Sequence, residues 1–183
     1  SLLYIYYITN NDILNIYSFL NKGDFMTHVF IVNPFAGGGK SLKILNTIKE
    51  VCNKENIDYI VRFTKAPNDA TKIAREYENL GGIIYSVGGD GTMNEVLNGI
   101  VGSKNLFGIL PAGSGNDFHR VLMAMDEISP TIDIGKINDR YFINIACIGI
   151  DADVANNVSI MKKTKIPASQ IYNISILYTF FKY

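Results

Sequence analysis

The fold of this chain is decided by the stretch GGIIYSVGGDGTMNEVLNGI at residues 81–100. Its first part, from Gly82 to Val87, is a short apolar run bounded by glycines, which is typical of a buried β-strand. Its second part, from Thr92 to Ile100, has apolar residues at helical spacing and predicts an α-helix. A strand, a glycine-rich loop and a helix in direct succession indicate one unit of an α/β domain.

The alternation of strand and helix continues on both sides of this stretch. Strands are predicted at residues 28–33, 57–64 and 106–110, and helices at residues 41–54, 68–80 and from residue 116 onward. Strands joined by helices in this order run parallel, with right-handed crossovers and with helices over both faces of the sheet. We therefore expect residues 26–130 to form a Rossmann-like three-layer α/β domain with a parallel sheet, in which ligands bind beyond the carboxyl ends of the strands.

Residues 1–25 differ in composition from the sequence that follows. They are dominated by Ile, Tyr, Leu and Asn, and a clean strand pattern begins only after Met26. We therefore expect Met26 to be the natural start of the protein and residues 1–25 to be a non-native or disordered extension.

The pattern changes again near Thr131. Two strand-like runs, at residues 131–136 and 140–148, are joined by Ile137-Asn138-Asp139, which is typical of a β-hairpin. A helical tail with densely spaced apolar residues follows, and such a helix needs a partner to cover it. Residues 131–183 are therefore expected to be the incomplete start of a second, mostly antiparallel β domain.

Charge and cysteine content narrow the function classes. With 17 basic and 17 acidic residues, the chain lacks the positive charge that marks nucleic-acid-binding proteins, so no nucleic-acid partner is expected. Cys52 and Cys147 lie far apart without metal-ligand spacing, which favours a reducing, cytoplasmic location, and Cys147 is expected to be buried.

No apolar stretch approaches the length of about 18 residues that a transmembrane helix needs. The basic cluster Lys162, Lys163 and Lys165 predicts a solvated face or, alternatively, binding to phosphate or to a membrane surface.

Three loops that directly follow predicted strands carry the residues suited to chemistry. The first is NPFAGGGKS at residues 33–41, where glycines let backbone N–H groups approach a phosphate and the following helix N-terminus favours an anion. It is not a Walker A loop, because Pro34 stands where glycine is needed, and it does not match the dinucleotide-binding fingerprint. Alone, this loop is compatible with an anion site and with a tight turn, and Ser41 is the expected helix N-cap.

The second loop is Gly88-Gly89-Asp90-Gly91-Thr92. Three glycines around one carboxylate favour close approach of the backbone to a ligand, because glycine loses the most entropy on folding. Asp90 would then lie among phosphate oxygens, where a carboxylate needs a metal ion or a proton. The alternative is a helix cap, because Thr92-x-x-Glu95 ahead of apolar residues is a capping box, and both interpretations can hold together.

The third loop is PAGSGND at residues 111–117. Ser114 offers a hydroxyl group, and Asn116 can cap the next helix and hold the loop in shape, so an Asn-capped turn is the alternative to a ligand site. His28 and His119 are the only histidines. His28 opens a strand and is expected to be structural, and His119 lacks the partner motif that a general base would have.

Together the three loops resemble the catalytic domain of the diacylglycerol kinase family, including its bacterial lipid kinase members. The resemblance rests on NPFAGGGK at residues 33–40, GGDGTMNEVLNG at 88–99 and PAGSGNDFHR at 111–120, with weaker support from 133–154 and 180–183. The block at 88–99 is also typical of NAD kinases and phosphofructokinases, whereas the block at 111–120 distinguishes lipid kinases. The family usually has threonine in place of Ser114 and alanine in place of His119, and serine keeps the hydroxyl group.

The resemblance implies an ATP site and a kinase reaction. A lipid hydroxyl at the membrane surface would attack the γ-phosphate of ATP, while protein groups position the reactants and neutralise charge. Asp90 would be the catalytic residue, in a network that orders the phosphates and Mg²⁺. The nucleotide-binding residues would be Asn33, Gly37, Gly38, Thr64, Gly88, Gly89, Asp90, Gly91, Thr92, Met93, Asn94 and Ser114.

The resemblance also implies that this chain is truncated. In the family, the metal-binding carboxylates and the general base lie in the second domain, at positions that fall beyond Tyr183. We therefore expect the chain alone to be inactive and to hold no complete metal site. An NAD kinase-like small-molecule kinase and a non-catalytic nucleotide-binding module are the alternative functions.

Overall fold

The chain forms two compact units, Ser1–Asn144 and Ile145–Tyr183. The structure, a computed structural model, describes residues 2–7, 26–113, 115–125, 131–147, 149–161, 164 and 166–182. These compact units divide after Asn144, and the domain boundary that the sequence pattern predicts after residue 130 stays a prediction.

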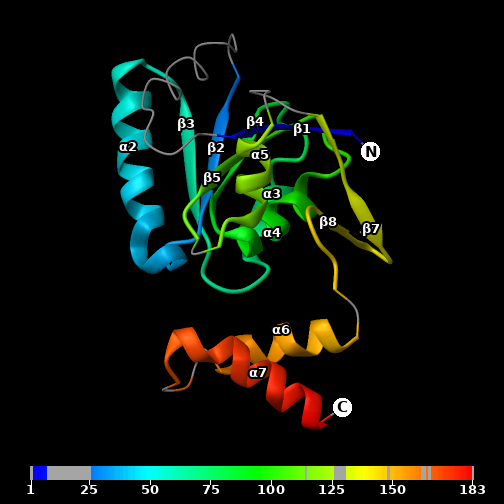
Figure 1. The fold of residues 1–183 in the computed structure, drawn as a ribbon. Helices are drawn as coiled ribbons and strands as arrows, with labels where there is room; N and C mark the ends of the chain where they lie inside the picture. Colours follow the sequence, from blue (N-terminus) through cyan, green and yellow to red (C-terminus); the bar gives the residue numbers. More distant parts are fainter. Residues whose placement is uncertain are drawn as a thin grey trace. The chain divides into compact units, whose positions relative to one another are not determined.

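The first unit is built on a six-stranded sheet with the strand order β3-β2-β4-β5-β1-β6 (Figure 1). The strands from β3 to β1 run parallel to their neighbours, and β6 runs antiparallel to β1. The predicted parallel sheet is therefore confirmed. The strands are β1 (Leu2–Tyr7), β2 (His28–Val32), β3 (Tyr59–Phe63), β4 (Ile83–Gly88), β5 (Leu106–Pro111) and β6 (Thr131–Asp133).

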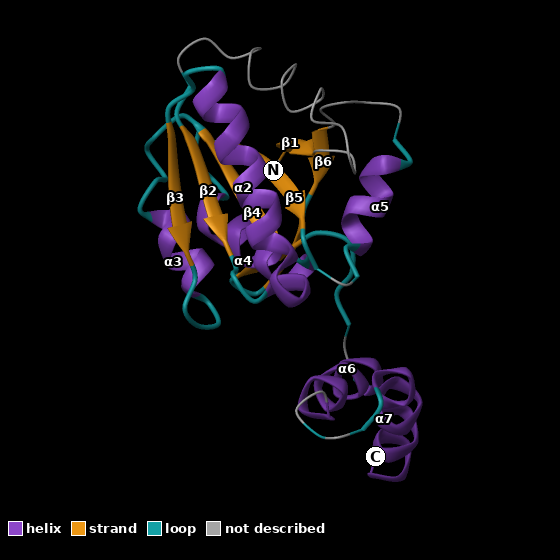
Figure 2. Cartoon of the chain, turned by 90° about the vertical axis from the view of Figure 1, so that its left-hand side faces the viewer, coloured by secondary structure: helices purple, strands orange, loops and turns teal. Residues whose placement is uncertain are grey.

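Helices cover both faces of this sheet (Figure 2). The helix α2 (Lys40–Lys54) packs on one face, and α3 (Asp69–Arg75), α4 (Asp90–Ile100) and α5 (Asp117–Met123) pack on the other. Side chains alternate along each strand, so Val29 and Ile31 pack with α3 and α4 while Phe30 and Val32 pack with α2. The predicted three-layer α/β architecture is confirmed.

The N-terminal segment contributes the strand β1 to the sheet. It pairs in parallel with β5, with Ile5 opposite Phe107, and antiparallel with β6. Residues 2–7 thus form a strand, whereas residues 8–25 lie outside the described residues, and that residues 1–25 are a non-native extension stays a prediction. The run LLYIYY is rich in aromatic and β-branched residues that favour strands, and it pairs with an edge of β5 that would otherwise be open. That Met26 is the natural start stays a prediction.

The segment that follows β6 also belongs to the first unit. The strands β7 (Gly135–Ile137) and β8 (Arg140–Phe142) form the predicted hairpin. The hairpin is fixed to α4, because the side-chain amide of Asn98 donates to the Tyr141 carbonyl and accepts from the Tyr141 N–H, both at 2.9 Å. These contacts between distant parts of the sequence place the unit boundary after the hairpin.

The second unit is a pair of helices, α6 (Ile150–Met161) and α7 (Ala168–Lys182). The side-chain amide of Asn157 on α6 donates to Thr179 Oγ1 on α7 at 2.8 Å.

Cys147 is exposed, so the prediction of a buried thiol is wrong: the strand ends at Phe142 instead of running on to residue 148. No helix within the described residues is long and apolar enough to cross a bilayer. The basic cluster at residues 162–165 falls outside them, apart from Thr164.

Gly99 lets α3 and α4 approach each other closely. A Cβ atom at Gly99 would lie 2.5 Å from Ala74 Cβ and 2.7 Å from the Thr71 carbonyl oxygen. A Cβ atom at Gly91, in the same helix α4, would meet nothing within 4 Å. The two glycines therefore form a matched pair for testing the packing.

We expect Gly99→Ala to destabilise the chain by about 1–3 kcal/mol because the new methyl group overlaps α3. Helix propensity alone would favour alanine by about 1 kcal/mol, so Gly91→Ala is expected to be neutral or stabilising. Urea unfolding of both variants measures the difference. Equal unfolding midpoints for the two variants would contradict the packing of α3 on α4.

Candidate functional site

The predicted site residues lie where the parallel strands end. Asn33 follows β2, Thr64 follows β3, and Gly88 and Pro111 are the last residues of β4 and β5. The strand ends are in register, since Val32 lies opposite both Phe63 and Val87, and Gly88 lies opposite Pro111. The three loops identified in the sequence therefore meet at one edge of the sheet, as predicted.

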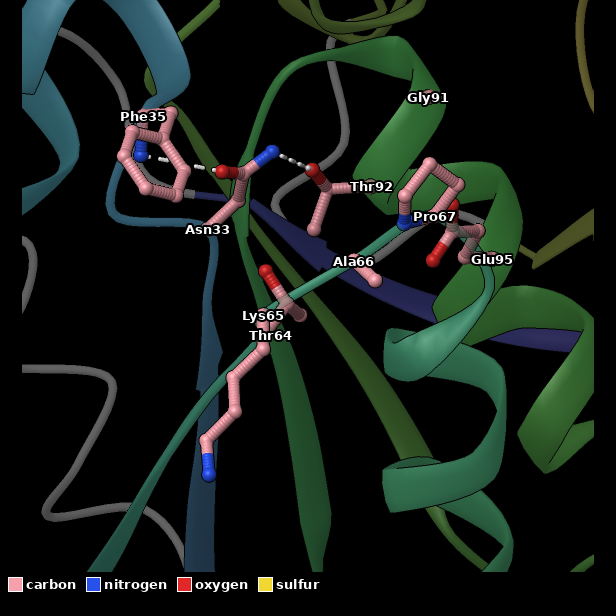
Figure 3. Close-up of a pocket in the computed structure, with 9 residues that line it drawn as sticks. All are labelled: Asn33, Phe35, Thr64, Lys65, Ala66, Pro67, Gly91, Thr92 and Glu95. Atoms are coloured by element: carbon pink, nitrogen blue, oxygen red, sulfur yellow. Dashed lines mark hydrogen bonds between the residues drawn. The ribbon is translucent and has the colours of Figure 1, made fainter.

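A cavity of about 300 Å³ opens at this edge (Figure 3). Four predicted nucleotide-binding residues line it, namely Asn33, Thr64, Gly91 and Thr92. Its other lining residues are Phe35, Lys65, Ala66, Pro67 and Glu95. Sequence patterns did not assign these five residues to the site, and for Ala66 and Pro67 they offered no signal, because the segment after β3 contains no recognisable motif.

Asn33 connects the first loop to the second. Its side-chain amide donates to Thr92 Oγ1 at 3.3 Å, and its side-chain oxygen accepts the N–H of Phe35 at 3.1 Å (Figure 3). Its carbonyl oxygen accepts a hydrogen bond of 2.6 Å from Ser41 Oγ. The predicted N-cap role of Ser41 is therefore wrong: α2 begins after Gly39, and the Ser41 hydroxyl closes the first loop instead.

Glycines let the three loops pack against one another. A Cβ atom at Gly37, where φ is +57°, would collide with the carbonyl oxygen of Ala112. A Cβ atom at Gly113 would lie 2.5 Å from Gly89 Cα, and one at Gly88 would collide with the Thr92 side chain. Contacts within the protein therefore account for Gly37, Gly88 and Gly89.

Three other glycines of these loops face open space. Nothing lies within 4 Å of a Cβ atom built at Gly38, Gly39 or Gly91. Gly38 and Gly39 have φ angles of +63° and +94°, which glycine adopts without strain, so the backbone conformation accounts for these two glycines. Gly91 has no such constraint, and a ligand can approach the backbone there. Gly91 also lines the cavity.

Asp90 holds the start of α5. Its half-buried carboxylate accepts the N–H of Asp117 at 3.3 Å and the N–H of Phe118 at 3.4 Å. Asp90 does not line the cavity of Figure 3; it lines a hollow of about 10 Å³ together with His119, which is buried. The catalytic role of Asp90 stays a prediction, to which the structure adds the capping of α5.

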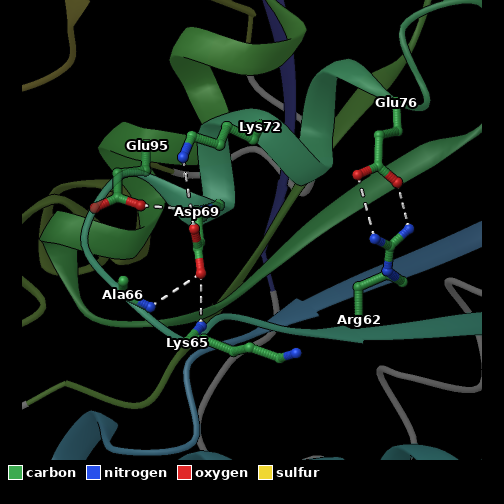
Figure 4. A network of polar contacts seen from close by, with 8 residues as sticks. Arg62, Lys65, Ala66, Asp69, Lys72, Glu76 and Glu95 are labelled. Carbon is green, nitrogen blue, oxygen red and sulfur yellow. Dashed lines mark hydrogen bonds and ion pairs between the residues drawn. The ribbon is translucent and has the colours of Figure 1, made fainter.

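Glu95 and Asp69 shape the wall of the cavity after β3 (Figure 4). Glu95 Oε2 accepts the N–H of Ala70 at 3.2 Å, and Asp69 Oδ2 accepts the N–H groups of Lys65 and Ala66 at 2.9 and 3.0 Å. The predicted capping box is therefore wrong. The helix α4 begins at Asp90 with Gly89 as its N-cap, so Thr92 already lies inside the helix and Glu95 is free to cap α3.

An ion pair between Arg62 and Glu76 links β3 to the end of α3. Arg62 Nη1 lies 2.5 Å from Glu76 Oε2 (Figure 4). The same nitrogen also donates to the Tyr77 hydroxyl at 2.9 Å. The hydrogen bond from Arg62 holds the pKa of the Glu76 carboxyl group below its ordinary value. The pair is solvent-exposed, so it orients β3 against α3 and contributes little to stability.

The third loop is fixed by Asn116. Its side-chain oxygen accepts the N–H of Gly113 and its side-chain nitrogen donates to the Gly113 carbonyl, both at 2.9 Å. The predicted loop-holding role of Asn116 is confirmed, although its side chain makes no capping bond to α5. Ser114 lies outside the described residues, so its contact with a nucleotide stays a prediction.

Two further predicted residues point away from the cavity. Met93 is buried in the core beneath α4. The side chain of Asn94 lies against the β8 strand, where its oxygen accepts a hydrogen bond of 3.4 Å from Arg140. Neither residue lines the cavity, and the structure supports packing and hairpin contacts for them.

Comparisons with known proteins place the chain in a family. The diacylglycerol kinase catalytic domain matches residues 27–146. Diacylglycerol kinases of Staphylococcus saprophyticus and Staphylococcus carnosus are 36% and 34% identical to it, over 65% and 73% of this chain. The chain spans 44% and 48% of the lengths of these relatives. A crystal structure of a diacylglycerol kinase from Bacillus anthracis is 33% identical and covers 58% of this chain and 40% of its own, with a TM-score of 0.48.

The family match covers well over half of the chain and includes all three loops. It also includes every residue that lines the cavity of Figure 3. The chain therefore belongs to the diacylglycerol kinase catalytic-domain family.

Proposed function

We propose that the full-length gene product is an ATP-dependent lipid kinase that transfers the γ-phosphate of ATP to the hydroxyl group of a diacylglycerol-like lipid at a membrane surface. Membership of the diacylglycerol kinase catalytic-domain family supports a kinase with a lipid acceptor over the NAD kinase-like alternative. Because the chain spans less than half of the two staphylococcal relatives, the complete reaction is proposed for the gene product and not for these 183 residues.

The observation that carries this proposal is the cavity at the carboxyl ends of β2 and β3, beside the first turns of α4. Its walls offer the hydroxyl groups of Thr64 and Thr92 and the side-chain amide of Asn33. The first N–H groups of a helix have no partner within the helix and favour a phosphate, and Gly91 exposes this turn of α4 without a side chain. These groups suit a nucleotide better than an apolar ligand.

Mg²⁺ would be held largely by the phosphates themselves. In the part of the chain that the structure describes, no group of three or more His, Cys, Asp or Glu side chains could hold a metal ion. Protein-bound Mg²⁺ commonly uses one or two carboxylates together with phosphate oxygens, and Asp90 and Glu95 are the carboxylates that α4 brings to this edge. When bound, Mg²⁺ would neutralise charge on the phosphates.

Gly91→Leu tests whether the cavity binds ATP. The new side chain would extend from an open position of α4 that lines the cavity. We expect the chain to bind ATP in isothermal titration calorimetry, and we expect Gly91→Leu to weaken the affinity by at least about tenfold. Gly91→Ala is the matched control and should bind almost normally. Unchanged affinity in Gly91→Leu would place the nucleotide elsewhere.

Asp90→Asn separates the charge of Asp90 from its capping role. The N–H groups of Asp117 and Phe118 bond to different oxygens of the Asp90 carboxylate, so asparagine keeps an acceptor for one of them, whereas alanine removes both. We expect Asp90→Asn to lower lipid phosphorylation by the full-length gene product at least about 100-fold, with a smaller loss of thermal stability than Asp90→Ala, which lowers both. Peptide mass spectrometry checks that the new Asn-Gly pair has not deamidated. Near-normal turnover by Asp90→Asn would exclude the catalytic role.

The chain alone is expected to bind ATP without phosphorylating lipid. It provides the cavity, but Asp90 is its only predicted catalytic group, and the described residues contain no metal-binding cluster. The test is transfer of label from γ-labelled ATP to diacylglycerol in mixed micelles, with the full-length gene product as the positive control. Labelled lipid produced by the 183-residue chain would refute this part of the proposal.

A further inference from the structure

Phe35 places an exposed aromatic ring on the wall of the cavity. Its side chain is 81% exposed, whereas Phe30 and Phe107 are buried in the core of the same unit. A single exposed phenylalanine is common on protein surfaces, so exposure alone indicates nothing. Phe35 differs from such a residue because it lines the cavity at the ends of the strands.

The backbone of Phe35 is anchored. Its N–H donates to Asn33 Oδ1 at 3.1 Å, and the Asn33 amide in turn donates to Thr92 Oγ1 at 3.3 Å on the next loop. Within the described ranges, no aromatic or cationic partner of the Phe35 ring is found. The structure therefore holds the loop in place and leaves the ring available for a ligand.

The rest of the cavity lining combines polar side chains with the apolar Ala66 and Pro67. Figure 3 shows Phe35 and Asn33 on one side of the cavity and Glu95 on the other, with Thr64 between them. Glu95 still has a second carboxylate oxygen besides the one that caps α3. A ring on one side and hydrogen-bonding groups on the other suit a ligand with a flat aromatic face and polar edges, and a nucleobase with its ribose has both.

We propose that the Phe35 ring stacks on the base of the bound nucleotide and sets the preference of the site for purine nucleotides. This inference rests on the proposed ATP site and assigns a base contact to Phe35, which lies in the NPFAGGGK loop but was not among the predicted nucleotide-binding residues. A purine covers more of the ring than a pyrimidine does, so ATP binds more tightly than CTP. The triphosphate contributes the same binding free energy with either base.

The test compares ATP with inorganic tripolyphosphate on variants of Phe35. We expect Phe35→Ala to weaken ATP binding about 5- to 150-fold, the usual contribution of base stacking, and to leave tripolyphosphate binding unchanged. Phe35→Tyr, which keeps the ring, should retain the ATP affinity. Because the side chain is exposed, Phe35→Ala should melt at the same temperature as the original chain.

Two results would overturn the stacking contact. One is an ATP affinity in Phe35→Ala within about twofold of normal, well below the stacking contribution. The other is an equal loss of ATP and tripolyphosphate binding, which would mean that the substitution disturbs the loop and that the ring does not contact the base. Failure of the original chain to bind ATP at all would instead overturn the proposed nucleotide site, and the stacking contact with it.

A fluorescence measurement gives an independent readout. The chain contains no tryptophan, so Phe35→Trp introduces the only indole group. A base stacked on the indole is expected to change its emission when ATP is added, and tripolyphosphate is expected to leave the emission unchanged. Calorimetric binding of ATP to Phe35→Trp without any change in emission would contradict the contact.

Discussion

The close approach of backbone at the carboxyl ends of β4 and β5 is the constraint on which the site depends. Gly89 and Gly113 pack so tightly that a Cβ atom on either would lie within 3.1 Å of the other loop. Gly37 in turn packs on Ala112, so all three loops form one body at the edge of the sheet. Packing between loops thus accounts for Gly37, Gly88, Gly89 and Gly113, and a positive φ accounts for Gly38 and Gly39. Gly91, which faces open space, remains for ligand contact.

Side-chain hydrogen bonds then fix this body to the helices. Asn33 ties the first loop to Thr92, Asp90 ties the second loop to α5, and Glu95 ties α4 to α3. Each of these side chains forms a hydrogen bond with a backbone or side-chain group that has no partner within a helix or strand. The cavity walls are therefore preorganised without a ligand, which would lower the entropic cost of binding the proposed nucleotide.

The sequence predicted the parallel sheet, its covering helices and the edge at which the site lies, because hydrophobic periodicity and glycine loops are local signals. It did not predict β1, whose place depends on pairing with β5 about 100 residues further along the chain. The partners of Asp90 and Glu95 were missed for the same reason: their hydrogen bonds join residues 25 or more positions apart. Phe35 lies in the NPFAGGGK loop, but nothing in the sequence singled it out within that loop, since a loop phenylalanine suggests a ligand contact only once the cavity beside it is known.

The most direct test of the central claim is a crystal structure of the chain with a non-hydrolysable ATP analogue. The account predicts phosphate oxygens within hydrogen-bonding distance of the first turn of α4, and the base beside the Phe35 ring. A triphosphate located away from the ends of β2, β3 and β4 would contradict the claim that these packed loops form a nucleotide site.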